Sequence, residues 1–331
     1  MDERSMPIVS VVIPVYNCEA FIRETVESAL AQTYPNIEIM VVDDGSTDGT
    51  KKQIEDLIKD RRIKYIFQEN AGPGVARNTG IKNTLGELIA LLDHDDLWMP
   101  EKIEKQVQFI RENPWADIVF CEGYGFDEKG NDKRRMARAE KRIKMIHKVL
   151  IKKKKEENGV LRPDFTDMIC EGIIRSPTSV MFKRRAFELT GDFAKNKVDD
   201  WIDDDWDMWL RMAAKGLKFA YVCEVLFKKR AHSANLTKLL MAKTEPSRKT
   251  PNSFESFMEG SSEKNTPIAK VWSATNAFSW SRNSMSQGNL RDGVGFGLRA
   301  ARFNKKYYLK LPGLLVRYFR FMLRRKLGIN Q

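Results

Sequence analysis

The sequence predicts an α/β fold, in which helices flank a central mixed, mostly parallel sheet and a helical extension follows at the C-terminal end. Short β-branched and aliphatic runs alternate with helical stretches through the first third of the chain, the pattern of a layered parallel sheet. Polar clusters follow these runs, where the carboxyl ends of parallel strands collect ligands. The 331 residues, 42% of them hydrophobic, suffice for one large core or two modest ones.

The predicted elements follow one another in a regular order. Strands are expected at residues 8–15, 37–42, 63–67, 87–92 and 118–121, and helices at 19–32, from about 48, through Ala76 and Ile81, and from Pro100 to near Asn113. Each of these strands is an apolar run, and turn-forming residues close several of them. Further along, 175–182 and 217–222 have strand character, while 184–189 and 206–214 have helical character.

We expect two parts in the chain, a larger domain over residues 1–237 and a linker with a basic amphipathic helical extension over 238–331. Residues 237–266 are rich in Ser, Thr, Asn, Pro and Lys, which is typical of a linker or a loosely packed loop. Residues 314–327 are predicted to be helical, with Arg317, Arg320 and Arg324 on one face. The polar, basic stretch 127–164 is interpreted as a solvated helical insertion, with an acceptor-facing flap as the alternative.

The net charge of +12 belongs to the C-terminal end of the chain. After Asp292 there are ten Lys and Arg residues and no acidic one, whereas the first 292 residues carry 47 basic against 45 acidic residues. This confined charge, interleaved with apolar residues, disfavours nucleic acid as a partner. It fits a helix resting on the anionic inner face of a membrane, and equally a helix that packs on the core or mediates a dimer.

The expected location is the cytoplasm, with peripheral contact to the cytoplasmic face of the membrane as an open alternative. No apolar stretch approaches the ~18 residues that cross a bilayer, and the first residues lack the apolar run of a signal peptide. The four cysteines are scattered singly, so we interpret them as reduced structural thiols.

Two acidic clusters carry the chemistry. Asp93 and Asp95 follow a buried apolar strand at alternate positions, so both carboxylates can aim at one divalent cation, Mg²⁺ or Mn²⁺, that also takes phosphate oxygens. Residues 203–207 place four acids in five positions before Trp209, more than the N-cap of a helix requires. Repulsion and partial burial would raise the pKa of at least one of them, which suits a general base. Acidic turns and helix caps are the plainer interpretations of both clusters.

Three further segments are weak functional signals by themselves and matter only together with the two acidic clusters. His232 follows the last predicted strand, and a lone histidine is usually structural or exposed. Asp44 and residues 45–48 form an ordinary capped helix start. Residues 72–78 form a loop into a helix, with Arg77 able to bind a phosphate or carboxylate.

Taken in chain order, these segments strongly resemble glycosyltransferase family 2. The resemblance rests on residues 10–17 (SVVIPVYN), 41–48 (VVDDGSTD), 72–78 with Gly80, 92–96 (LDHDD) and 204–211 (DDWDMWLR). It spans roughly residues 7–237. It implies a GT-A fold, which is Rossmann-like, a nucleotide-sugar donor that is commonly UDP-linked, a divalent metal, and inversion at the anomeric carbon.

The resemblance also implies roles on the donor side. Pro14, Tyr16 and Asn17 would border the base and the ribose, and Asp44 would accept a hydrogen bond from the base. Arg77 would lie near the donor.

At the metal and the reacting centre, Asp95 would be the firmer metal ligand and Asp93 would share its duty with the ribose. Asp205 matches the catalytic base, with Asp204 one residue away as the alternative because it stands where the family often has Glu. His232 matches a histidine that in some members helps to hold the metal or the diphosphate.

The sequence thus predicts an enzyme that moves one sugar from a nucleotide-sugar to a hydroxyl of a glycan or lipid-linked acceptor, in building a cell-surface polysaccharide. A sugar nucleotidyltransferase is an alternative, although residues 14–21 contain neither the glycine nor the lysine of a triphosphate loop. A non-catalytic nucleotide- or sugar-binding module is another. The absence of spanning helices in the sequence disfavours a processive synthase.

Overall fold

The computed structural model describes residues 6–127, 132–152, 156–157, 160–163, 174, 176–193, 204–232 and 235, and residues 290, 291, 294, 295 and 298. The chain divides into two compact units, one of Met1–Asp164 and Ile173–Leu236 and the other of Phe165–Gly172 and Thr237–Gln331. The expected linker 237–266 and the expected helix 314–327 lie outside the described residues. The architecture below is that of the first unit.

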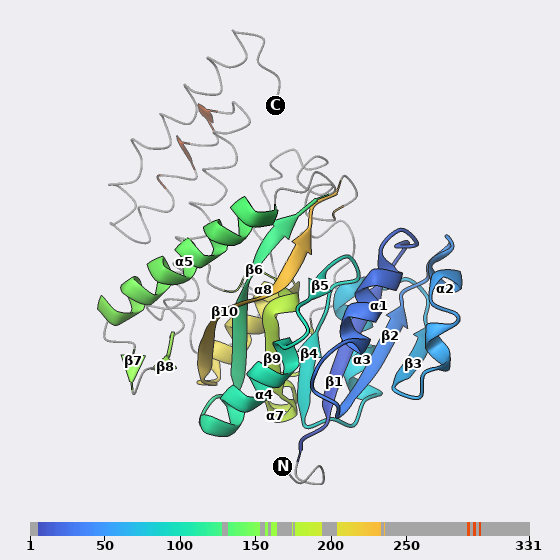
Figure 1. The fold of residues 1–331 in the computed structure, drawn as a ribbon, viewed down its shortest axis with the longest axis horizontal. Coiled ribbons are helices and arrows are strands. Elements are labelled where there is room, and N and C mark those ends of the chain that lie inside the picture. The colour runs from blue at the N-terminus through green and yellow to red at the C-terminus, as the bar shows by residue number, and fades with distance from the viewer. Residues whose placement is uncertain are drawn as a thin grey trace. The chain divides into compact units, whose positions relative to one another are not determined.

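The described part of the first unit is built on an eight-stranded sheet in the order β3-β2-β1-β4-β9-β6-β10-β5 (Figure 1). The strands are β1 (Val9–Val15), β2 (Ile37–Asp43), β3 (Ile63–Phe67), β4 (Leu88–Leu91), β5 (Leu97–Trp98), β6 (Ile118–Phe126), β9 (Val180–Lys183) and β10 (Phe219–Arg230). The pairs β1–β2, β2–β3, β1–β4 and β6–β10 are parallel. β9 runs antiparallel between β4 and β6, and β5 is antiparallel to β10. The predicted mixed, mostly parallel sheet is confirmed.

Helices cover the sheet between the strands. They are α1 (Ile22–Leu30), α2 (Thr50–Gln53), α3 (Pro73–Lys82), α4 (Lys102–Glu112), α5 (Asp132–Lys152), α7 (Arg184–Thr190) and α8 (Asp204–Ala214), with 3₁₀ turns η2 (Leu57–Lys59) and η3 (Pro177–Ser179). A two-stranded hairpin joins β7 (Glu156–Glu157) and β8 (Val160–Leu161). The helix expected from about residue 48 is only one turn long, and Thr50 and Ile54 are the buried side chains of that stretch.

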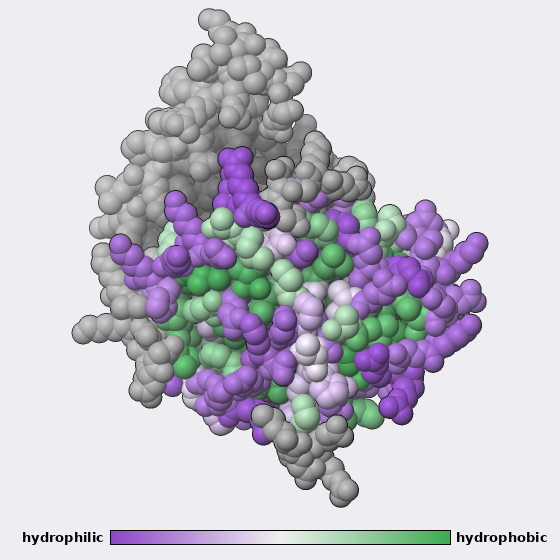
Figure 2. Space-filling model, viewed as in Figure 1, coloured by the Kyte–Doolittle hydropathy of each residue, from purple (hydrophilic) through white to green (hydrophobic). Residues whose placement is uncertain are grey.

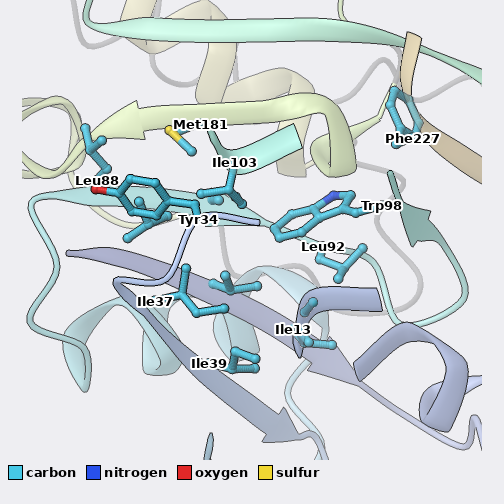
Figure 3. Close-up of a cluster of buried hydrophobic side chains, with 14 of the residues drawn as sticks. Ile13, Tyr34, Ile37, Ile39, Leu88, Leu92, Trp98, Ile103, Met181 and Phe227 are labelled. Atoms are coloured by element: carbon cyan, nitrogen blue, oxygen red, sulfur yellow. The ribbon is translucent and has the colours of Figure 1, made fainter. Parts of the chain in front are cut away.

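The main core lies on the face of the sheet that α1 and α4 cover. The seven residues of β1 are all buried, and alternate ones, Val9, Val11, Ile13 and Val15, belong to this core. Figure 3 shows part of the cluster, in which Ile13, Ile39, Leu92 and Trp98 converge from different elements. On the other face Met40 and Val42 pack against Ala76 of α3.

α3 lies unusually close to β1. A Cβ on Gly80 would come within 2.4 Å of Val12 Cγ1, so the position admits no side chain without movement of the core. The start of α3 also needs a glycine, since Gly72 has φ +93°. These two glycines set the approach that carries Arg77 to the edge of the sheet.

α5 is helical, as predicted for the basic stretch, but it is not wholly solvated. Ala139, Ile146 and Leu150 are buried, and the helix packs on β6 and β10. The sequence interpretation of a solvated insertion is therefore corrected, because these residues recur at helical spacing and form one apolar face. Apolar residues also reach the molecular surface, as Figure 2 shows, which is ordinary for a folded protein.

Candidate functional site

The acids that follow β4 lie at the edge of the sheet where β1, β2, β6 and β10 also end, in agreement with the register of these parallel strands. Asp96 is fully buried. Its carboxylate accepts hydrogen bonds from Thr178 Oγ1 at 2.7 Å and from the backbone N–H of Arg230 at 3.0 Å. Burial and then the charges of Asp95 and Asp93 raise the pKa of Asp96 well above its usual range. Asp96 therefore joins the acidic loop to β10 and η3.

Hydroxyl groups of η3 and its preceding residue fix Asp93. The backbone N–H of Asp93 donates to Thr178 Oγ1 at 3.2 Å, and Ser176 Oγ donates to Asp93 Oδ2 at 3.3 Å. Sequence analysis did not single out Ser176 or Thr178. The signal that could have found them is Pro177, which restricts the backbone between two hydroxyl residues just before a strand.

Arg77 connects the two acidic clusters. Its side chain is buried and donates to Asp93 Oδ1 at 3.0 Å and to Asp204 Oδ2 at 2.5 Å. Burial acts to lower the pKa of Arg77, but Asp204 and Asp93 raise it further, so the guanidinium stays charged. For Asp93, burial raises the pKa, and Arg77 and Lys229 lower it below its usual value. Arg77 thereby holds the Asp93 carboxylate as an anion and brings the carboxylates of Asp93 and Asp204 to one point.

The acids at the start of α8 differ in their surroundings. Asp204 is buried against Arg77, and Asp207 is buried against Arg211, whose Nε lies 2.9 Å from its carboxylate. Arg211 also donates to the backbone oxygens of Thr190 and Asp192, so Asp207 stabilises the packing of α7 and α8. Asp205 is half-buried and its charge acts on Arg77 and on Lys229. Asp203 lies outside the described residues.

Asp95 meets the segment that follows β10. His232 Nε2 lies 2.9 Å from Asp95 Oδ2, and Asn235 Nδ2 donates to the same oxygen at 3.0 Å. The structure thus brings together Asp95 and His232, which are far apart in the sequence.

Arg230 fixes the backbone at Asp95, and sequence analysis missed it. Its Nε donates to the backbone oxygen of Asp95 at 3.1 Å, and its guanidinium lies between the rings of Phe21 and Phe126, at 4.6 and 4.5 Å. Its remaining donor bonds Glu24 of α1 at 2.6 Å. Only the basic character of the end of β10 could have indicated it.

On the other side of the site, the carboxylate of Asp44 organises a loop. It accepts hydrogen bonds from Gln68 Nε2 and from the N–H groups of Ala71 and Gly72, at 2.6, 3.0 and 2.8 Å. Asp44 is buried, and in this structure its bonds fix the turn into α3. A contact of Asp44 with a base remains a prediction.

Tyr16, Asn17 and Pro14 border the same end of β1. Tyr16 is exposed, which leaves its ring available to a ligand. Asn17 has φ +46° and accepts from the N–H of Thr47 at 2.8 Å, which fixes the backbone in a left-handed turn. The carbonyl of Pro14 lies 3.0 Å from His94 Nδ1, so β1 is tied to the acidic loop.

A family model described as glycosyl transferase family 2 matches residues 10–187. The chain belongs to glycosyltransferase family 2. A relative from Rickettsia typhi, described as an uncharacterized glycosyltransferase, is 32% identical over 240 residues, which are 72% of this chain and 69% of that protein. The resemblance found in the sequence is therefore confirmed.

Other relatives match over shorter stretches. An uncharacterized glycosyltransferase of Rickettsia felis is 46% identical over 129 residues, which are 39% of this chain and 21% of that protein. The putative teichuronic acid biosynthesis glycosyltransferase TuaG of Bacillus subtilis is 43% identical over 112 residues, or 33% of this chain and 44% of that protein. The family 2 chain thus spans about a fifth of the length of the Rickettsia felis relative.

Solved structures show that the family 2 chain has the GT-A fold. Residues 1–349 of S. aureus TarS, in complex with UDP-GlcNAc, superpose with a TM-score of 0.62 at 18% identity, over 97% of this chain and 92% of that one. The mannosyltransferase PcManGT of Pyrobaculum calidifontis, in complex with GDP-Man and Mn²⁺, superposes with a TM-score of 0.51 at 18% identity, over 98% of this chain and 88% of that one.

The donor atoms at Asp95 and His232 suit the divalent cation that family 2 enzymes commonly use. Carboxylate oxygen and imidazole nitrogen are ligands for Mn²⁺, and Mg²⁺ accepts the carboxylate. Within the described residues no group of three or more His, Cys, Asp or Glu side chains gathers around one point. Among the residues that the structure describes, no helix combines the length and apolar character needed to cross a membrane.

Proposed function

We propose that this family 2 protein is an inverting glycosyltransferase that moves one sugar from a UDP-sugar to a hydroxyl of a glycan or lipid-linked acceptor. The observation that carries the proposal is the bridge from Arg77 to Asp93 and Asp204. This bridge joins the acids after β4 to the acids of α8, so a metal-bound diphosphate and a base can face one sugar.

The neighbours support the choice of substrates. TarS was solved with UDP-GlcNAc, which supports a UDP-sugar donor over other nucleotide-sugars. TuaG is named for teichuronic acid biosynthesis, which supports a role in building a cell-surface polysaccharide.

Asp205 is the preferred general base. Asp205 stands at the position that matches the catalytic base of the family, whereas Asp204 binds Arg77 and Asp207 binds Arg211. Asp205 would take the proton of the acceptor hydroxyl as its oxygen attacks the anomeric carbon from the face opposite the nucleotide. Such a single displacement inverts the configuration.

Asp95 and His232 would hold Mn²⁺ or Mg²⁺, with Asp93 shared between the metal and the ribose. When bound, the cation supplies a Lewis acid that neutralises the charge of the departing diphosphate. Arg77 keeps Asp93 oriented and ionised, and Arg230 holds the backbone of Asp95. Tyr16, Asn17, Pro14 and Asp44 would receive the nucleoside.

The test is a panel of nucleotide-sugars, incubated with and without added Mn²⁺, in which release of the nucleotide is measured. We expect release from a UDP-sugar that depends on the metal. If the protein bound the donor but released no nucleotide, with or without acceptors, it would be a non-catalytic binding module. Formation of a nucleotide-sugar from a nucleoside triphosphate would establish a nucleotidyltransferase instead.

Asp205→Asn tests the base. The variant should bind donor normally and transfer the sugar about 10²- to 10⁴-fold more slowly, the usual contribution of a general base. Asp192→Asn, an equal change at a surface ion pair with Lys82, is the matched control and should transfer normally. Near-normal transfer by a folded Asp205→Asn protein would remove Asp205 from this role.

A further part of the proposal concerns location. The basic segment after Asp292 would rest on the anionic cytoplasmic face of a membrane, where lipid-linked acceptors would be within reach. The segment lies outside the described residues apart from residues 294, 295 and 298, so its sequence carries this step.

A further inference from the structure

α5 is fixed to the sheet by one face. Ala139, Ile146 and Leu150 are buried on that face. Two of its arginines are already paired: Arg135 with Asp127 at 2.5 Å, and Arg142 with Glu122 at 3.3 Å. The described apolar residues on this face are therefore used in packing, and Met145 is the one large apolar side chain of α5 that is exposed in the described part of the helix.

The opposite face of α5 carries a row of cations. Arg134, Arg138, Lys141 and Lys148 are exposed and follow one another at helical spacing, so they form a single line, which we name the α5 basic stripe. Met145, 57% exposed, fills the one gap in this line. From Arg134 to Lys148 the stripe is about 21 Å long, at ~1.5 Å per residue.

The stripe is not neutralised within the described part of the chain. Lys133 and Lys144 flank it and are also exposed, whereas Glu140 is the one exposed acid recorded between residues 133 and 150. None of the four cations has an ion-pair partner among the described residues.

The stripe begins near the rim of the site. Arg135, beside Arg134, donates to the backbone oxygen of Gly125 at 3.3 Å, close to the C-terminal end of β6. Gly125 and Phe126 pair with Lys229 and Arg230 of β10. The backbone N–H of Arg230 in turn bonds Asp96. From this end α5 runs away from the tip of β6, as Figure 1 shows.

We infer that the α5 basic stripe binds an extended polyanionic glycan, which is the acceptor, with its growing end in the site. The inference rests on the proposed function and names the class of its acceptor. A linear row of cations that starts at the site matches a linear polymer of carboxylates or phosphates whose end must reach Asp205. A bilayer is a poorer match, because a membrane-bound amphipathic helix buries its apolar face in the lipid, and α5 buries that face in the protein.

The test measures binding of the full chain to fluorescent oligogalacturonate long enough to span the stripe, at about 50 and about 200 mM NaCl. The variant is Arg134→Gln, Arg138→Gln, Lys141→Gln and Lys148→Gln together. The matched control is Lys51→Gln, Lys52→Gln, Lys59→Gln and Arg61→Gln, which removes the same charge from exposed positions in and after α2 and η2. A neutral maltooligosaccharide and phosphatidylglycerol vesicles are the comparison ligands.

The stripe variant should bind oligogalacturonate about tenfold more weakly than the parent at the lower salt, with a smaller salt dependence. The control should change by less than about twofold, and the neutral glycan should not distinguish the proteins. Equal loss in the stripe variant and the control would overturn the inference. So would a stripe variant that loses vesicle binding but keeps oligogalacturonate binding. The assay contains no donor and measures no turnover, so it tests the stripe even if the protein releases no nucleotide from any donor.

Discussion

Arg77 shows why the site could be only partly predicted at the scale of single residues. The sequence marks it as a partner for a phosphate or carboxylate, because it lies in the first part of a helix that follows a glycine-rich loop, and the family resemblance implies a position near the donor. Its two carboxylate partners come from β4 and α8, and only the folded chain shows that one planar guanidinium reaches both. A fork of fixed donors can do this, whereas an ammonium is a single point of charge.

Arg77→Lys should therefore destabilise the protein, although the charge is kept. One of the buried carboxylates would lose its partner, and we expect the free energy of unfolding to fall by about 1–3 kcal/mol in urea denaturation. Arg23→Lys is the control, since Arg23 forms a similar two-pronged contact with Asp56 but on the surface. That change should lower the free energy of unfolding much less, because water already solvates this pair. If the two changes lowered the free energy of unfolding equally, the contacts of Arg77 would contribute no more than a surface ion pair.

Lys102 is a buried cation on the first turn of α4. Its ammonium donates to Gln106 at 2.7 Å and lies 4.2 Å from the centroid of the Trp98 ring. Burial lowers its pKa to about 8 from the model-compound value of 10.5. The folded state therefore binds this proton less tightly than the unfolded state, and the penalty is fully present below pH 8. It is relieved as the pH rises from about 8 to about 10.5.

Lys102→Met should stabilise the protein at pH 7, because a thioether needs no hydration. A shift of this size corresponds to about 3 kcal/mol as an upper bound. The gain should shrink between about pH 8 and about pH 10.5, where the parent lysine becomes neutral. Urea denaturation of both proteins across this range is the measurement. A gain that stays constant with pH would show that Lys102 keeps its proton in the fold.

Among the elements, η3 has only three residues but fixes the acidic loop after β4. Thr178 donates to Asp96 and accepts from the N–H of Asp93, so one hydroxyl holds both ends of the acidic loop. Thr178→Val keeps the shape and removes both bonds. We expect the apparent affinity for Mn²⁺ to fall about 10- to 100-fold, as for other residues that orient metal ligands.

The control for this change is Thr190→Val, whose hydroxyl bonds the backbone of its own helix at Ala186. It should leave the Mn²⁺ dependence unchanged. If Thr178→Val lowered the free energy of unfolding but left the Mn²⁺ dependence unchanged, Thr178 would have only a structural role.

The elements were predicted well where apolar runs are short and closed by turns. Strands β1, β2 and β4 agree within a few residues, because burial on both faces leaves continuous apolar segments. β3 also agrees, although it is an edge strand in which Lys64 and Phe67 are exposed. β6 and β10 continue well past their predicted ends at 121 and 222. Their extensions contain Glu122, Lys228 and Arg230, which are tolerated because the two strands pair with each other and carry local partners.

Site residues divide in the same way. Asp93, Asp95, Asp204 and Asp205 could be found because carboxylates stand out after an apolar strand or at a helix start. Ser176, Thr178 and Arg230 were missed, because Pro177 and the basic end of β10 are weak signals and the role of a hydroxyl or an arginine shows only when the fold gives it a partner. The roles assigned to all of them in catalysis stay predictions.

At the scale of the whole molecule, the chain has two basic segments of different kinds. The α5 basic stripe lies in the first unit, on a helix whose apolar face is already buried. The segment after Asp292 belongs to the second unit and interleaves ten cations with aromatic and aliphatic residues. The segment after Asp292 is therefore the better candidate for insertion of apolar side chains into a lipid surface.

One flotation experiment with phosphatidylglycerol vesicles should distinguish the contributions of these two segments to membrane binding. The full chain should float, since each of several cations near an anionic surface adds about 1 kcal/mol of attraction. A version ending at Asp292, and a full chain with Arg317→Gln, Arg320→Gln and Arg324→Gln, should both float less, whereas the stripe variant of α5 should float like the parent. Equal flotation of the full chain and the version ending at Asp292 would exclude the membrane role of the C-terminal segment, and packing or dimerisation would then account for its apolar residues.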